Sequence, residues 1–206
     1  MRRRLVIAGM AAALALPAPA LAQEEPAGGE GRTLQEATER LRARLGPEAA
    51  DRLRTIVDRA AERGAPADPL LDKALEGAAK GVPADRIAPA LETFARRLER
   101  SAGLVGRPAG PDAVVAGADA LSRGVPAEEV RRVARSAPAG GRAVPLVVLG
   151  DLVEAGVPAR SAADVVREAV RGGRSQQELL RIPARVRRMI RQGVPPSRAA
   201  GRAPGP

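Results

Sequence analysis

The chain has 206 residues and a formal net charge of +10, and it contains no His, Cys, Trp or Tyr. Without His and Cys it lacks the usual general base near neutral pH, the thiolate nucleophile and the common zinc ligands. We therefore expect no enzyme, no cofactor, and no catalytic, cofactor-binding or metal-binding residues.

The N-terminal segment is typical of a secretory signal peptide. Arginines at positions 2–4 precede an apolar run over 5–16, and small residues lead to Ala22. This order predicts cleavage after Ala22, and the apolar run is too short for a permanent membrane span. The alternative is an uncleaved N-terminal helix. We expect a periplasmic or secreted bacterial protein that loses residues 1–22.

A first helical lobe is predicted over residues 33–102. Residues 23–32, rich in Glu, Gly and Pro, indicate a flexible leader. The capping box that starts at Thr33 opens the first helix. Three more helices follow, and the fourth has apolar residues at the spacing of an amphipathic helix: Ile87, Leu91, Phe94 and Leu98.

The tripeptide Gly-Val-Pro is the recurring signal of the chain. It occurs at residues 81–83, 124–126, 156–158 and 193–195, with the variant Gly-Ala-Pro at 64–66. Glycine closes a helix in the left-handed conformation, and proline suits the first position of the next helix. Three pairs of glycines, at 64 and 81, 124 and 141, and 156 and 173, are each 17 residues apart. A repeat of one helix plus its turn explains this spacing, and coincidence among abundant glycines is the alternative.

The second half of the chain predicts another helical lobe. A loop rich in Gly and Pro is expected over 103–111, and the lobe over 112–194. Within it, 144–149 also has the composition of a strand. The last helix is expected over 183–192, and a disordered tail over 195–206. The fold class is all-α: an irregular array of short antiparallel helical hairpins, solenoid-like or a small bundle, with disordered ends.

Carboxylate pairs are the remaining route to catalysis, because paired acids can hydrolyse glycosides. The candidates are Glu24-Glu25 in the leader and Glu128-Glu129 at a helix start, where acids are favoured by the helix dipole. The two lysines, Lys73 and Lys80, are interpreted as solvated. A hydrolase is therefore the third functional class, behind two binding functions.

The positive charge lies at the two ends of the chain. Setting aside the three N-terminal arginines and those beyond Glu178 leaves 24 basic and 24 acidic residues in 23–180, a neutral body. The candidate polyanion-binding residues are Arg181, Arg185, Arg187, Arg188, Arg191, Arg198 and Arg202. Basic amphipathic helices bind anionic lipid or acidic protein surfaces. The alternative is that Ile182, Val186 and Ile190 simply cap the helical stack while the arginines face water.

Two functions follow from these patterns. The first is a non-catalytic interaction or structural module of the bacterial envelope, with an unidentified envelope protein as its partner. The second is a binder of an anionic membrane surface or another polyanion through the basic C-terminal helix and tail. Nucleic acid is a poor candidate because the chain is predicted to be exported and lacks stacking aromatics.

Overall fold

The computed structural model describes residues 28–203, which form ten α-helices and one 3-10 turn and contain no strand. The helices are α1 (Gly28–Leu45), α2 (Pro47–Glu62), α3 (Ala67–Ala79), α4 (Ala84–Val105), α5 (Pro111–Ser122), α6 (Ala127–Ser136), α7 (Ala143–Glu154), α8 (Ala159–Arg171), α9 (Gln176–Arg191) and α10 (Pro196–Arg202), with the 3-10 turn η1 at Ala139–Gly141. The all-α prediction is confirmed. The strand alternative for 144–149 is wrong because these residues lie in α7. The predicted signal peptide lies outside the described residues.

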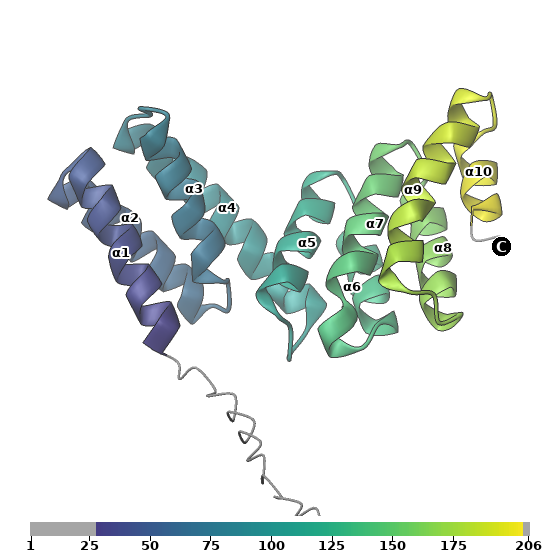
Figure 1. Cartoon of the computed structure of the whole chain (residues 1–206), viewed down its shortest axis with the longest axis horizontal. Coiled ribbons are helices and arrows are strands. Elements are labelled where there is room, and N and C mark those ends of the chain that lie inside the picture. The colour runs from purple at the N-terminus through teal and green to yellow at the C-terminus, as the bar shows by residue number, and fades with distance from the viewer. Residues whose placement is uncertain (1–27, 204–206) are drawn as a thin grey trace, which may run out of the picture.

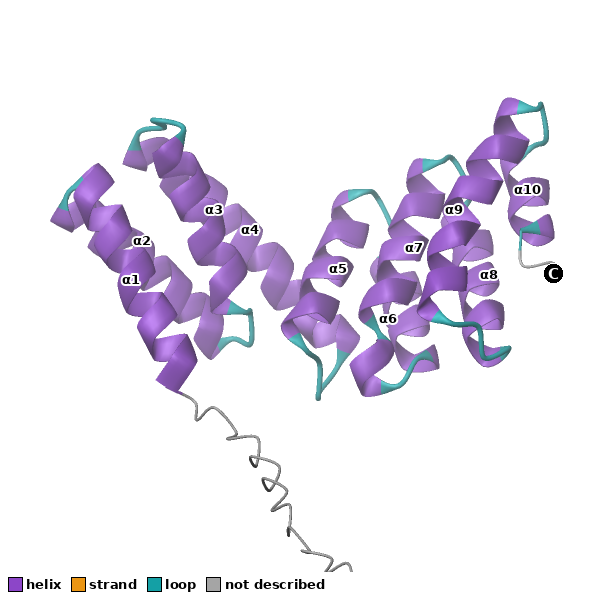
Figure 2. Cartoon of the chain, viewed as in Figure 1, coloured by secondary structure: helices purple, strands orange, loops and turns teal. Residues whose placement is uncertain are grey.

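The helices form an elongated array of two groups, α1–α4 and α5–α10 (Figure 1). Helix α4 runs from the first group towards the second and packs against α5 and α6. Short loops join consecutive helices at alternating ends, as expected for antiparallel hairpins (Figure 2).

Six helix junctions share one hydrogen-bond pattern. Each has a glycine with φ between 69° and 90°: Gly64, Gly81, Gly124, Gly156, Gly173 and Gly193. The residue after each glycine donates its N–H to the carbonyl five residues earlier, at 3.0–3.1 Å. At Val157 this acceptor is the Leu152 carbonyl. These are Schellman ends, which satisfy carbonyls that the helix leaves unpaired.

The prolines do not stand where the tripeptide predicts. Pro83, Pro126 and Pro158 are N-cap residues with ψ between 132° and 145°, so each helix begins one residue later than expected. The Pro83 carbonyl accepts hydrogen bonds from Arg86 N–H at 2.9 Å and Ile87 N–H at 3.1 Å. The 17-residue repeat is also interrupted, because Gly141 closes a 3-10 turn without positive φ.

The break between the two groups is shorter than the predicted loop over 103–111. Helix α4 continues to Val105 and α5 begins at Pro111, which leaves 106–110 as the connection. Arg142 holds this connection, since its Nη1 donates to the carbonyls of Val105 at 3.2 Å, Gly106 at 3.0 Å and Pro108 at 2.9 Å.

Both ends of the described chain contain more helix than expected. Helix α1 begins at Gly28, inside the predicted leader over 23–32. Where a disordered tail was expected from residue 195, Pro196–Arg202 form α10, which packs against α8 and α9. Its buried side consists of alanines, Ala199, Ala200 and Ala203, and such small residues give a weak hydrophobic signal in the sequence.

The C-terminal helix α9 also begins earlier than predicted. The Glu178 N–H donates to Ser175 Oγ at 3.3 Å, and the Ser175 N–H donates back to the Glu178 carboxylate at 2.8 Å. This capping box fixes the start of α9 at Gln176, ahead of the start predicted at residue 183. Pro183, expected to begin a separate helix, is buried inside α9.

The core consists of two apolar clusters that meet at α4 and α5. The first cluster covers α1–α4 and includes Val114 and Ala118 of α5. The second covers α5–α10 and includes Leu104 and Val105 of α4. Because each of these two helices contributes to both clusters, the groups are joined by a packed junction.

Candidate functional site

The acid pair proposed from the sequence does not form a free acid–base pair. Glu128 binds Arg131 at 2.7 Å and Glu129 binds Arg132 at 3.0 Å, each three residues further along α6. These are ordinary contacts between successive turns of one helix. The other candidate pair, Glu24-Glu25, lies outside the described residues.

Sequence reasoning missed a cluster of acids around Arg123. Asp119, Asp151 and Glu154 bind this guanidinium at 2.8, 2.6 and 2.7 Å. Burial lowers the pKa of Arg123, but its bonds to Asp119 and Asp151 and the attraction of Glu154 outweigh burial and raise that pKa. Because each of the three carboxylates forms an ion pair with Arg123, this cluster links α5 to α7.

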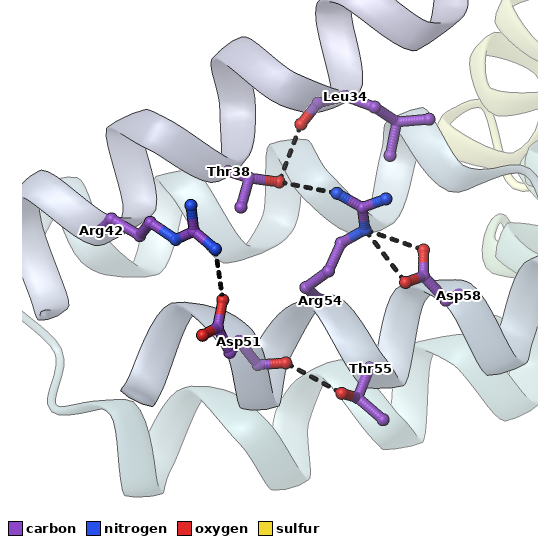
Figure 3. Close-up of polar contacts among 7 residues, drawn as sticks. All are labelled: Leu34, Thr38, Arg42, Asp51, Arg54, Thr55 and Asp58. Atoms are coloured by element: carbon purple, nitrogen blue, oxygen red, sulfur yellow. Dashed lines mark hydrogen bonds and ion pairs between the residues drawn. The ribbon is translucent and has the colours of Figure 1, made fainter. Parts of the chain in front are cut away.

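The α1–α2 contact is a second polar cluster of the same kind (Figure 3). Arg42 binds Asp51 at 2.8 Å, and Arg54 donates to Thr38 Oγ1 at 3.3 Å and binds Asp58 at 2.9 Å. Thr38 in turn donates to the Leu34 carbonyl at 2.8 Å. The polar side chains drawn in Figure 3 form hydrogen bonds and ion pairs with one another, which favours a structural role for this cluster.

Both lysines of the chain bind one carboxylate on α3. Lys73 Nζ lies 3.0 Å from Glu76, and Lys80 makes a still closer contact with the same side chain. Hydrogen bonds from Lys80 and Lys73 lower the pKa of Glu76 from 4.5 to about 2. Lys73 is thus held in place at the edge of the groove described below.

This pair of contacts predicts an unusual titration. The folded pKa of Glu76 lies below its ordinary value, so the ion pairs are intact above about pH 4.5 and are lost as pH falls towards 2. Side-chain carboxyl NMR should give an apparent pKa near 2, and Lys80→Gln should raise it more than Lys73→Gln does. A Glu76 pKa near 4.5 in the unaltered protein would contradict the geometry.

A groove of about 770 Å³ lies where α3, α4 and α5 meet. We call it the interlobe groove. It is lined by Lys73, Pro89, Ala90, Thr93, Phe94, Arg97, Val115, Ala118, Asp119 and Ser122. Phe94 is the only Phe in a chain without Trp or Tyr. It is half-buried against the first core cluster and presents the rest of its surface to the groove.

Among the charged residues of the groove, Arg97 differs from the others. Lys73 is bound to Glu76, and Asp119 is bound to Arg123. Arg97 is exposed and makes no hydrogen bond or ion pair within residues 34–203. The groove therefore combines an apolar floor with one available cation.

The seven candidate arginines lie on α9 and α10, and all are exposed. Arg187 lies 3.8 Å from Asp151 of α7, and Arg185 Nη1 lies 3.5 Å from the carbonyl oxygen of Ala203. Ile182 and Val186 are fully buried and Ile190 is half-buried. The structure thus shows that these apolar residues pack into the array, as the alternative reading of this helix required.

Comparison of the chain with protein-family models, curated proteins and solved structures finds no match. Between residues 28 and 203, no helix combines the length and apolar character needed to cross a membrane. In the same range, no three or more His, Cys, Asp or Glu residues are grouped so that they could hold a metal ion.

Proposed function

We propose that this protein is an exported, non-catalytic helical interaction module that docks a partner protein of the bacterial envelope in the interlobe groove. The observation that carries the proposal is Phe94, the one aromatic residue of the sequence, half-buried on the groove floor. Aromatic side chains in partly desolvated pockets are common anchors of protein interfaces. The N-terminal sequence pattern supports export.

The groove also indicates the chemistry of the partner. Phe94, Val115 and Ala118 offer an apolar floor. Arg97 adjoins this floor and has no ion-pair partner among the described residues. A segment that places an apolar side chain on the floor and a carboxylate beside Arg97 would satisfy both features. The proposed partner therefore presents an amphipathic, acidic segment.

Site-specific photo-crosslinking in the native host tests the proposal. A photoreactive residue at Thr93, inside the groove, should give one discrete crosslinked product. The matched control is Thr55 on α2, because both threonines are exposed and donate to a carbonyl four residues earlier at 2.9 Å. Thr55 does not line the groove and should give no such product.

Charge reversal identifies the contact. Arg97→Glu should reduce the Thr93 product about tenfold or more, because it places like charges together. Arg100→Glu makes the same change one turn further along α4, outside the groove, and should leave the product unchanged. Equal crosslinking from both threonine positions, or equal loss in both variants, would contradict groove docking. A product found only in the cytoplasmic fraction would contradict export.

A further inference from the structure

The outward face of α9 concentrates positive charge. The buried side of the helix is formed by Leu179, Ile182, Pro183 and Val186. At 3.6 residues per turn, the five arginines of α9 fall within an arc of about 160° on the opposite side of the helix. No Asp or Glu follows Glu178 in the sequence, so beyond that first-turn acid the face has no negative charge of its own.

Leu180 lies within this basic face. It is 50% exposed and is the one exposed large hydrophobic residue in the part of the chain that the structure describes. It shares a line along the helix with Ala184, Arg187 and Arg191, at spacings of four, three and four residues. An apolar side chain therefore projects from among the cations.

The basic face continues onto α10. Arg185 reaches the Ala203 carbonyl at 3.5 Å, which brings the end of α10, and with it Arg202, next to the α9 arginines. Four exposed arginines, Arg188, Arg191, Arg198 and Arg202, make no side-chain ion pair or hydrogen bond within residues 34–203. Most of the positive charge on this surface is therefore available to a ligand.

A polar outer face is also what any terminal helix of an array needs for solubility. That requirement is met by mixed charges, and it does not call for an exposed leucine or the absence of acids. A soluble polyanion would use the arginines alone. A lipid surface uses both features, because guanidinium groups bind headgroup phosphates while a leucine enters the acyl boundary.

We propose that the outward face of α9, extended by α10, binds the anionic surface of a lipid bilayer, with Leu180 as its apolar anchor. This site is separate from the interlobe groove and does not depend on docking there.

Co-sedimentation with phosphatidylcholine vesicles, with and without phosphatidylglycerol, tests the proposal. The full chain and the chain from Gln23 are both used, and each substitution is judged as a ratio within one form, so that residues 1–22 contribute equally. The protein should sediment with anionic vesicles and less with neutral ones, and salt should weaken binding. Arg188→Gln/Arg191→Gln should reduce the affinity about tenfold or more. The charge-matched control Arg40→Gln/Arg44→Gln on α1 should change it less than about twofold.

Leu180→Gln separates lipid from soluble polyanions. It should weaken binding to anionic vesicles severalfold while leaving retention on heparin unchanged. Absence of binding to anionic vesicles, or equal loss from both arginine pairs, would overturn the proposal. An arginine effect without a leucine effect would mean that the surface binds phosphate groups without an apolar anchor, which would also overturn the proposal. Arg97→Glu should leave vesicle binding intact, so failure of groove docking and failure of lipid binding are distinguishable.

Discussion

Leu149→Ala should lower the free energy of unfolding by about 2–5 kcal/mol, the range for a leucine removed from a packed core. Leu149 is fully buried in α7, which packs against α5, α8 and α9. Nearly half of the buried apolar residues are alanines, 20 of 44. A packed core relaxes only partly around a cavity, so most of the lost packing is not recovered. Thermal melting should shift down by roughly 5–15 °C.

The matched control for this substitution is Leu180→Ala, which removes the same atoms from a half-exposed site. It should change the stability by less than about 1 kcal/mol. Urea unfolding followed by circular dichroism measures both. Equal effects of the two substitutions would mean that Leu149 is not packed as a core residue.

The same measurement shows whether the two clusters unfold together. Leu91 is fully buried in the first cluster. Because α4 and α5 pack into both clusters, Leu91→Ala and Leu149→Ala should each shift a single transition. Two separate transitions would mean that the junction transmits little stability from one group to the other.

Much of the helical pattern was predictable from the sequence, for a local reason. A glycine with positive φ followed by proline fixes backbone conformation within a few residues, whatever the rest of the chain does. The ends at Gly81, Gly124 and Gly156 were therefore found, whereas Gly141 was assigned a helix end that it does not make. Helix α10 was missed because its contacts use alanine methyl groups, which leave a faint amphipathic pattern.

The interlobe groove was not predictable in this way. Lys73, Phe94 and Asp119 come from three different helices, and their meeting depends on how the groups pack at α4 and α5. Phe94 was identified only as a core residue of α4, because periodicity does not distinguish a fully buried position from a groove floor. The arginines of α9 were identified from charge alone, and the placement of Leu180 among them needed the helix boundaries.

Gly117→Ala should destabilise the protein by about 1–3 kcal/mol, although alanine is the better helix former. In α5, a Cβ at this position would lie 3.1 Å from Val105 Cγ2 and would collide with Ser101 Oγ, both on α4. Ser101 is buried and donates to the Val114 carbonyl at 2.7 Å, so moving it disturbs a satisfied hydrogen bond. Overpacking at the junction of both clusters should outweigh the gain in helix propensity.

Gly103→Ala is the matched control, because Gly103 lies in α4, is exposed, and a Cβ there would meet nothing within 4 Å. That substitution should raise stability by about 0.5–1 kcal/mol. A double-mutant cycle with Ser101→Ala then locates the clash: removing Oγ should recover part of the Gly117→Ala loss, leaving the contact with Val105. If both glycine substitutions stabilise the protein equally, α4 and α5 do not approach each other as closely as this junction requires, and the shape of the interlobe groove changes with it.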